Sequence, residues 1–436
     1  MKLMPKTIIP KAILVLLTTL LVNNTSLASQ TNKQPYNIIF IMADDLGIET
    51  IGAYGGSSYK TPSINQLAAD GIRFNNAHSQ PLCTPTRVKV MTGLYNFRNY
   101  QHFGYLPPDS TTFAHLLKDQ GYATGVFGKW QLVRSSPAAQ SITGMLPENA
   151  GFDEHVLWQV FPKTRGKRFW QPTLTENGQL TTYGAEEFGP KILNDRLLDF
   201  IERKKDQAFF AYYPMVLPHD PFVTTPDNLT AKTRQEKFTA MVQYMDKMVG
   251  NIRAKVEQLG IAERTIIIFA GDNGTHESIV STRHGQKVNG GKRKTYNTGT
   301  NVPFIVYGPN VKFKGSISNA LINFNDILPS LVNFAGAKLA DNHQTDGRSI
   351  TPFLNDPDRK GREHIFIHYD PRWANEGLSR YVFDTKWKLY EDGRFFDIIK
   401  DPSEITPIAL TNMPTGTKSN YKRLKRVLDS MPKSKH

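Results

Sequence analysis

Short apolar runs that alternate with helical patterns are the feature that most constrains this sequence. Five runs lack the polar positions of a half-exposed strand, so we interpret them as strands buried on both faces. They cover residues 37–42, 123–127, 209–213, 265–270 and 303–307. Helical patterns lie at residues 63–71, 111–120 and 237–259. Strands that alternate with helices predict an α/β fold, with a large, mixed, mostly parallel sheet sandwiched by helices.

The C-terminal part of the sequence has a different pattern. Closely spaced strand-like runs cover residues 381–383, 386–390 and 395–398, with a helical pattern after them at 419–430. Asp392-Gly393 is a hairpin signal between the last two runs. We therefore predict a small antiparallel α+β subdomain over residues 339–436, after a larger α/β domain over residues 29–338.

Residues 1–28 have the pattern of an export signal. Three lysines precede an apolar run at 12–22 that is short for a membrane span, and Ser26-Leu27-Ala28 offers a cleavage site. We expect a cleaved signal peptide and a periplasmic or secreted protein, with an uncleaved anchor as the alternative. No later stretch is apolar enough to span a bilayer, so we expect no membrane contact after cleavage.

The charge of the sequence bears on its partners. The formal net charge is +14, and residues 1–28 hold three lysines and no acidic residue, which leaves +11 for the rest. Such a surplus attracts polyanions. The sequence has no RNA-binding aromatic motif, zinc finger or basic helix with heptads, so we do not expect nucleic acid as a partner. A sulfated or otherwise acidic glycan fits both the charge and the expected export.

Cys83 is the only cysteine of the sequence. One thiol cannot form an internal disulfide and is a poor start for a zinc site, so an inert buried thiol, an intermolecular bridge or chemistry at this residue remain. We predict that Cys83 opens a helix, with Thr84 as its N-cap, Pro85 at its first position and Gly93 as its stop. The free N–H groups of such a helix start favour an anion, and Arg87 lies about one turn further on.

Polar residues directly follow four of the predicted strands. Ligands of open α/β sheets bind beyond the carboxyl ends of the strands, so we expect these residues to converge on one site. They are Asp44, Asp45, Lys129, Gln131, His219, Asp272 and Asn273. Aspartate and asparagine are also common in turns, so the repeated position after a strand carries this prediction.

Four of these residues offer only oxygen ligands for a metal. They are Asp44, Asp45, Asp272 and Asn273. An all-oxygen set suits a hard cation, Ca²⁺ or Mg²⁺, and not zinc. We predict Ca²⁺, because adjacent acidic and amide residues make an irregular shell with many ligands.

The segment Cys83-Thr84-Pro85-Thr86-Arg87, followed by Met91-Thr92-Gly93, resembles the signature of the type I sulfatases. These are formylglycine-dependent, arylsulfatase-like members of the alkaline phosphatase superfamily, and the resemblance implies an alkaline phosphatase-like fold. Further similarities follow in the family's order along most of the chain. They cover residues 37–45, 121–130, 218–219, 271–274, 290–292, 302–304, 326–329, 346–349 and 386–390.

The resemblance implies that a separate maturation enzyme converts Cys83 to formylglycine. One hydroxyl of the hydrated aldehyde then attacks sulfur, and deprotonation of the other releases sulfate and restores the aldehyde. One Ca²⁺ per chain would be held by residue 83 together with the four oxygen-bearing residues that follow the strands.

The resemblance also implies roles for the remaining polar residues. Arg87 would steady the formylglycine and the metal side of the site. Lys129 and Lys292 would hold sulfate oxygens and offset charge in the transition state. His219 would be the general acid for the leaving alcohol.

Gln131 departs from the family's pattern, which commonly has a histidine at this position. That histidine is often given the role of base in releasing sulfate. Glutamine can hydrogen-bond the diol but cannot take its proton. His276 and His284 are candidates for a replacement base.

Polar and aromatic residues in loop-like segments are candidates for a sugar-binding site. They are His102, His284, His368, Arg372 and Trp373. Each of these residues is also compatible with ordinary loop structure.

The leading hypothesis from the sequence is an exported sulfuric ester hydrolase that acts on a sulfated carbohydrate. Oligosaccharides of an acidic polysaccharide, such as a sulfated galactan, are the expected substrates. A phosphodiesterase or phosphonate monoester hydrolase of the same superfamily is one alternative. A catalytically silent sulfated-glycan-binding protein is another, suggested by the basic charge and by Gln131.

Overall fold

The computed structural model describes residues 1, 35–134, 143–373, 376–411 and 413–433. The described residues from 35 to 433 form one compact unit. The predicted signal peptide lies outside the described residues, except for Met1, and the boundary predicted at residue 338 stays a prediction. No described helix is both long and apolar enough to cross a membrane.

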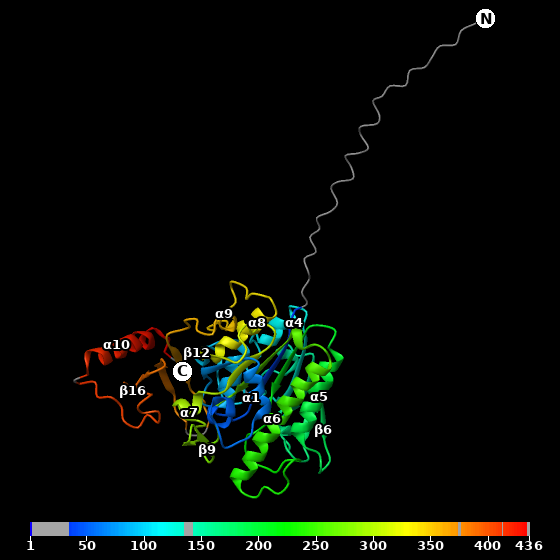
Figure 1. Ribbon diagram of the computed structural model, residues 1–436, viewed down its shortest axis with the longest axis horizontal. Coiled ribbons are helices and arrows are strands. Elements are labelled where there is room, and N and C mark those ends of the chain that lie inside the picture. The colour runs from blue at the N-terminus through cyan, green and yellow to red at the C-terminus, as the bar shows by residue number, and fades with distance from the viewer. Residues whose placement is uncertain (2–34, 135–142, 374–375, 412, 434–436) are drawn as a thin grey trace. The chain divides into compact units, whose positions relative to one another are not determined.

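A large mixed sheet forms the centre of this unit (Figure 1). Its five neighbouring strands from β8 to β4 are parallel, and the strands toward both edges include antiparallel pairs. In spatial order the strands are β12 (Ser316–Asn323), β2 (Ile72–His78), β11 (Phe304–Tyr307), β8 (Thr265–Gly271), β1 (Asn37–Ala43), β7 (Phe209–Pro214), β3 (Ala123–Lys129), β4 (Glu154–Trp158), β5 (Thr173–Glu176) and β6 (Gln179–Thr182).

Helices cover both faces of this sheet and bury two separate apolar cores. On one face lie α1 (Pro62–Ala69), α5 (Gly189–Arg203) and α6 (Arg234–Gln258), and on the other α2 (Cys83–Thr92), α4 (Phe113–Lys118), α8 (Ile327–Phe334) and α9 (Thr351–Asn355). Along β1, side chains alternate between the cores, with Phe40 in one and Ile41 in the other. A strand with both faces buried has to be apolar throughout, which explains the uninterrupted apolar runs of the sequence.

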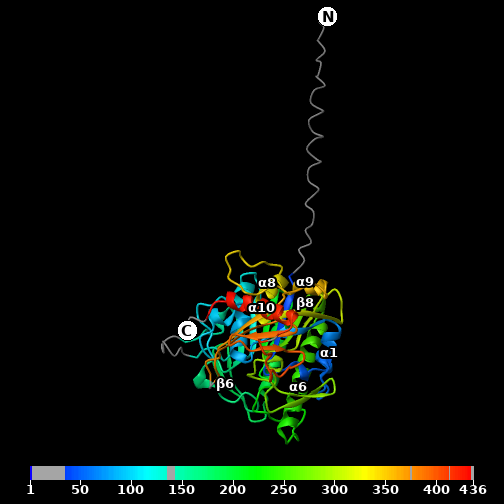
Figure 2. The same ribbon diagram turned by 90° about the vertical axis from the view of Figure 1, so that its left-hand side faces the viewer.

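A smaller sheet near the C-terminus is entirely antiparallel (Figure 2). Its strands are β13 (Ile365–Tyr369), β14 (Ser379–Phe383), β15 (Trp387–Tyr390) and β16 (Phe395–Asp397), and α10 (Thr415–Ser430) covers it. Leu424 and Leu428 of α10 pack into the apolar cluster on one face of this sheet. Further elements include the short helices α3 (Asn96–Asn99) and α7 (Asn297–Thr300) and the hairpin of β9 (Val280–Arg283) and β10 (Gln286–Asn289).

The structure confirms the predicted fold class, and most predicted elements agree with it to within a few residues. The predicted strand at 303–307 is β11, which runs antiparallel to β8. The predicted helix start at Cys83 is also confirmed, and Gly93 ends α2 with a φ of 68°. The predicted N-cap is wrong. Leu82, not Thr84, precedes the helix, and its carbonyl accepts from the Thr86 hydroxyl at 2.9 Å.

Candidate active site

A cavity of about 340 Å³ contains Cys83 and side chains from the carboxyl ends of the central parallel strands. Lys129 ends β3, and His219 follows β7 by a short loop. Cys83 is the first residue of α2, and Lys292 follows the β9–β10 hairpin. The other lining residues are Leu82, Phe103, Gln131, Trp158, Arg165, Arg168, Asp220, His276, Glu277, Arg293 and Trp373.

Three buried carboxylates lie behind these cavity walls, at the ends of the neighbouring strands β1 and β8. Asp44, Asp45 and Asp272 have no exposed surface. The Asp45 backbone N–H donates to Oδ1 of Asp272 at 2.9 Å, and Nδ2 of Asn273 donates to Oδ1 of Asp45 at 2.8 Å. The two strand ends therefore form one connected acidic cluster.

The donor atoms of this cluster fit a hard divalent cation. Ligand atoms of Asp44, Cys83 and Asp272 all lie within 4.8 Å of one another. Oδ1 of Asn273 is buried and has no hydrogen-bond partner among the described residues, so its lone pairs are available to a cation. Burial and the neighbouring Asp44 raise the pKa of Asp272 to about 7. Oxygen atoms from carboxylates and an amide are the ligands that Ca²⁺ and Mg²⁺ prefer.

Three cations of the chain balance the three carboxylates. Nζ of Lys129 lies 3.0 Å from Oδ2 of Asp44, and Nζ of Lys292 lies 2.6 Å from Oδ2 of Asp45. Arg87 donates from Nε and Nη2 to Oδ2 of Asp272, at 3.2 and 3.0 Å. Its Nη1 also donates to the Lys129 carbonyl at 3.1 Å, which ties α2 to the end of β3.

Cys83 lies against this charged cluster. Its Sγ is 3.5 Å from Nζ of Lys129, and only 2% of the residue is exposed. Burial raises the pKa of the Cys83 thiol. The unmodified side chain is therefore a protonated thiol at neutral pH, in contrast to cysteine nucleophiles, which have a lowered pKa.

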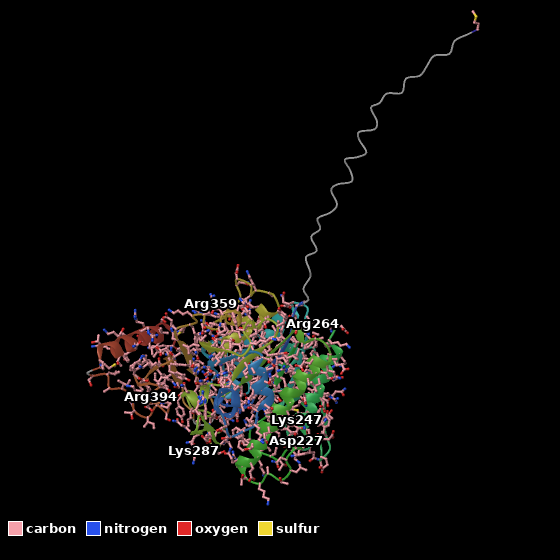
Figure 3. The ribbon with its side chains drawn as sticks, in the orientation of Figure 1. Asp227, Lys247, Arg264, Lys287, Arg359 and Arg394 are labelled. Carbon is pink, nitrogen blue, oxygen red and sulfur yellow. The ribbon has the colours of Figure 1, made fainter. Side chains whose placement is uncertain are left out.

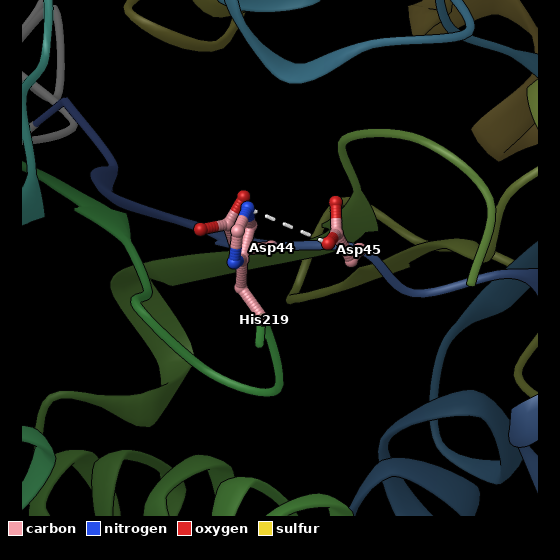
Figure 4. A group of neighbouring side chains, drawn as sticks. All are labelled: Asp44, Asp45 and His219. Carbon is pink, nitrogen blue, oxygen red and sulfur yellow. Dashed lines mark ion pairs between the residues drawn. The ribbon is translucent and has the colours of Figure 1, made fainter. Parts of the chain in front are cut away.

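His219 lies beside Asp44 and Asp45, with Nε2 of its ring toward Asp45 (Figure 4). Its Nε2 is 3.0 Å from Nζ of Lys292 and 3.6 Å from Oδ2 of Asp45. On the other side of the ring, Nδ1 is 2.6 Å from the Asp220 carbonyl, so the Nδ1 proton points there and Nε2 is the acceptor of the neutral ring. Burial lowers the pKa of His219.

Arg168 is a buried residue of this site that sequence reasoning missed. Its guanidinium lies over the ring of Trp158, 4.5 Å from the centroid, and donates to the carbonyl of Asp220. Its Nη2 is 3.1 Å from Nδ1 of His219. Trp158 is the last residue of β4, a strand that the sequence did not predict. Arg168 lies in a loop with no local sequence signal.

The structure brings together only some of the predicted sugar-binding residues. Trp373 lines the cavity with Cys83, whereas His284 lines a different cavity beside Glu49. His102 is buried and stacks on Tyr105, and His368 is buried in β13. Arg372 pairs with Asp370 at 2.9 Å and donates to a backbone carbonyl. Of the two histidines considered as replacement bases, His276 is the one that lines the cavity.

Comparison with known proteins shows the family. The family model for sulfatases matches residues 36–337. Human arylsulfatase A is 28% identical over 443 residues, which cover 92% of this chain and 85% of that protein. Steryl-sulfatase of Rattus norvegicus is 27% identical over 446 residues, which cover 81% of this chain and 76% of that protein.

Solved structures share the fold at lower identity. The crystal structure of Ps i-CgsB has a TM-score of 0.76 at 22% identity and covers 91% of this chain and 92% of its own; the same protein was also solved with k-i-k-neocarrahexaose. BT4656 in complex with D-glucosamine-2-N,6-O-disulfate has a TM-score of 0.74 at 21% identity, with 91% and 97% covered. A phosphonate monoester hydrolase of Agrobacterium radiobacter has a TM-score of 0.69 at 18% identity, so the fold alone does not define the reaction.

The chain belongs to the sulfatase family. It is a sulfuric ester hydrolase, as the sequence predicted. Members of this family generally use a formylglycine and a divalent metal ion, and the described residues contain one cysteine beside an acidic cluster.

We predict that Arg87→Met destabilises the protein strongly, because Asp272 and Asp44 would lose the guanidinium that lies 3.0 and 3.5 Å from them in a fully buried cluster. The expected loss in the free energy of unfolding is about 3–5 kcal/mol. Lys247→Met is the matched control, because Lys247 and Asp227 form an exposed ion pair at 2.8 Å (Figure 3). The control should change stability by less than about 1 kcal/mol. Equal midpoints of denaturant unfolding for the two variants would contradict this account.

Proposed function

We propose that this protein removes sulfate from a sulfated carbohydrate, with residue 83 as the nucleophile after its conversion to formylglycine. The observation that carries this proposal is the position of Cys83. It lies at the start of α2, inside a cavity, within 3.5 Å of Lys129 and beside an acidic cluster that fits a divalent cation. A matured residue 83 supplies one hydroxyl for attack on sulfur and a second through which sulfate is released.

We propose Ca²⁺ as the metal, held by Asp44, Asp45, Asp272, Asn273 and residue 83. A bound cation supplies positive charge that favours an ionised nucleophile and stabilises the sulfate oxygens. The unpartnered Oδ1 of Asn273 supports this assignment, because a buried acceptor oxygen without a hydrogen-bond or metal partner costs free energy. Arg87 holds the orientation of Asp272 by its paired hydrogen bonds.

Lys129 and Lys292 are positioned to bind the sulfate group. Both line the cavity, and both ammonium groups are fixed by ion pairs with Asp44 and Asp45. Donors that are held in place before the reaction need no reorganisation when charge develops on the sulfate oxygens. The proposed sulfate position is therefore between these two amines, next to residue 83.

His219 is positioned to serve both proton transfers of the proposed reaction. Because burial lowers the pKa of His219, the ring has to take up a proton at Nε2 before it can give one to the leaving alcohol, and the neutral ring then accepts one from the second hydroxyl of residue 83. His219 therefore ends each turnover with the proton that it began with. One further proton is lost when water hydrates the aldehyde again and the attacking hydroxyl ionises, and it leaves to solvent. The double role of His219 matters because Gln131 cannot accept a proton. In His276, the Ser278 backbone N–H donates to Nδ1 at 3.1 Å, which leaves the ring proton on Nε2 and no free acceptor.

We propose sulfated sugars as the substrate class. We also propose that the protein is exported. The net charge of the sequence is strongly positive, and arginines and aromatic side chains line the cavity beside residue 83. Aromatic rings and arginines suit a sugar ring that carries anionic groups. Structural neighbours solved with a glucosamine disulfate and a neocarrahexaose support this class.

The central test is sulfate release by the matured protein. Intact mass should first show the loss of about 18 Da that accompanies conversion of a thiol to an aldehyde. We expect sulfate release from an aryl sulfate and from at least one of a panel of sulfated galactan and glycosaminoglycan oligosaccharides. Cys83→Ala should reduce the rate at least about 1,000-fold. Full activity of Cys83→Ala, or faster cleavage of matched phosphate diesters and phosphonates, would overturn the proposal; glycan binding without any sulfate release would indicate a silent binding protein.

Metal binding can be tested apart from activity. After treatment with a chelator, added Ca²⁺ should raise the melting temperature, because at a hundredfold excess over Kd it contributes about 2.7 kcal/mol. Mg²⁺ should give a smaller shift, because it requires octahedral geometry. Asp45→Asn should abolish the Ca²⁺ shift, and Asp227→Asn, an exposed acidic control, should keep it. An unchanged shift in Asp45→Asn would exclude the assigned site.

The double role of His219 predicts a specific defect in His219→Gln. An activated aryl sulfate needs no acid for its leaving group, so phenol should still be released once per enzyme molecule. Sulfate release should then stall, because no other side chain takes the second proton. Phenol and sulfate are measured separately over time, with His276→Gln as the matched control that should release both in step. Steady release of sulfate by His219→Gln would show that another residue is the base.

A further inference from the structure

A second cavity adjoins the one that contains Cys83. It also measures about 340 Å³, and the two cavities share the side chains of Phe103, Gln131, Arg165 and Trp373. Binding sites for small ligands usually measure about 300–1,000 Å³, so each cavity alone is at the small end of this range. A chain of sugar residues that enters the first cavity can therefore extend into the second.

The charge of the second cavity is positive and unbalanced. Arg134 and Arg165 line it, and no acidic residue is among its lining residues. Neither arginine forms an ion pair with a carboxylate in the part of the chain that the structure describes. By contrast, Arg293 in the first cavity pairs with Glu277 at 2.7 Å. Two guanidinium groups without counterions favour an anionic ligand with planar, paired hydrogen bonds.

The uncharged walls of the second cavity suit a sugar ring. Phe103 and Trp373 stack on each other with centroids 5.1 Å apart, and Trp373 is 37% exposed, which leaves apolar surface for a ring. Gln131 and Gln159 offer amide groups to hydroxyls. Oε1 of Gln159 is buried and has no hydrogen-bond partner among the described residues.

The backbone that presents these amides is fixed by an unusual turn. Gln131 and Gln159 follow the neighbouring parallel strands β3 and β4, and both have a φ of 56°. Residues other than glycine rarely adopt this left-handed conformation, and such residues cluster at ligand sites. The Gln131 N–H donates to the Gln159 carbonyl at 3.0 Å, which locks the two turns together.

We propose that the second cavity binds a second anionic group, carried by the sugar next to the one that loses its sulfate. The substrate class is thus an oligosaccharide with a sulfate or carboxylate on each of two adjacent sugars. This inference rests on the proposed function of the first cavity. Arg134 and Arg165 bind the second anion, and the aromatic pair supports the ring that carries it.

Binding to Cys83→Ala tests this subsite without turnover. Calorimetry would compare κ-neocarrabiose, with one sulfate, and ι-neocarrabiose, with a second sulfate on the neighbouring sugar. A second pair is a chondroitin sulfate disaccharide and its uronate methyl ester, which differ by one carboxylate charge. In one of the two pairs, we expect the ligand with the additional anion to bind at least about 10-fold tighter. A response in the first pair indicates that the second cavity prefers sulfate, and a response in the second pair indicates that it prefers carboxylate.

Variants of the two arginines test whether the second cavity is the place where the additional anion binds. Arg134→Gln and Arg165→Gln should each reduce the affinity ratio within the responding pair at least about 5-fold, and Arg134→Lys should keep part of it. Arg359→Gln, which removes the same charge from a residue outside both cavities (Figure 3), should leave the ratio unchanged. A ratio near one in both pairs, or a ratio that survives both glutamine variants, would overturn the subsite. Failure of the matured protein to release sulfate would instead count against the proposed function.

Discussion

The balance of buried charge is the constraint on which the rest of this structure depends. Asp44, Asp45 and Asp272 are completely buried, and an unpaired buried carboxylate costs several kcal/mol. Their partners come from α2, from the end of β3 and from the segment after β10. Parts of the chain that are far apart in sequence must therefore meet at one sheet edge before the cluster is stable.

The same ion pairs connect the interior of the protein to its cavity. Lys129 and Lys292 contact buried carboxylates with atoms that also face the cavity, so their positions are set by the core and not by a ligand. The two apolar cores hold the central parallel strands in register on both faces. A site on strand ends of this kind is stiffer than one built on loops alone, which favours electrostatic stabilisation of a developing charge.

The sequence predicted the centre of the protein better than its edges, for a physical reason. Central strands are apolar throughout and are followed at once by the polar residues of the site. The pattern that predicts the strand therefore also marks the position of the site residues. The edge strands β5 and β6 are short and partly exposed, and they carry no such pattern. Arg168 and Arg134 lie in loops, where long-range contacts and not local sequence decide the position. His102 and His368 looked like loop residues in sequence, but the fold buries them.

Gln131 joins the two halves of the proposed mechanism. The turn that holds it is fixed by its backbone bond to Gln159, so its side chain forms the wall shared by both cavities. A neutral amide here removes a proton acceptor from the reaction centre but offers hydrogen bonds to a sugar that crosses the wall. Binding energy from a remote part of a substrate can be used to orient the reacting group. The proposed double role of His219 makes accurate placement of the sulfate matter more, and the proposed anion site in the second cavity would supply it.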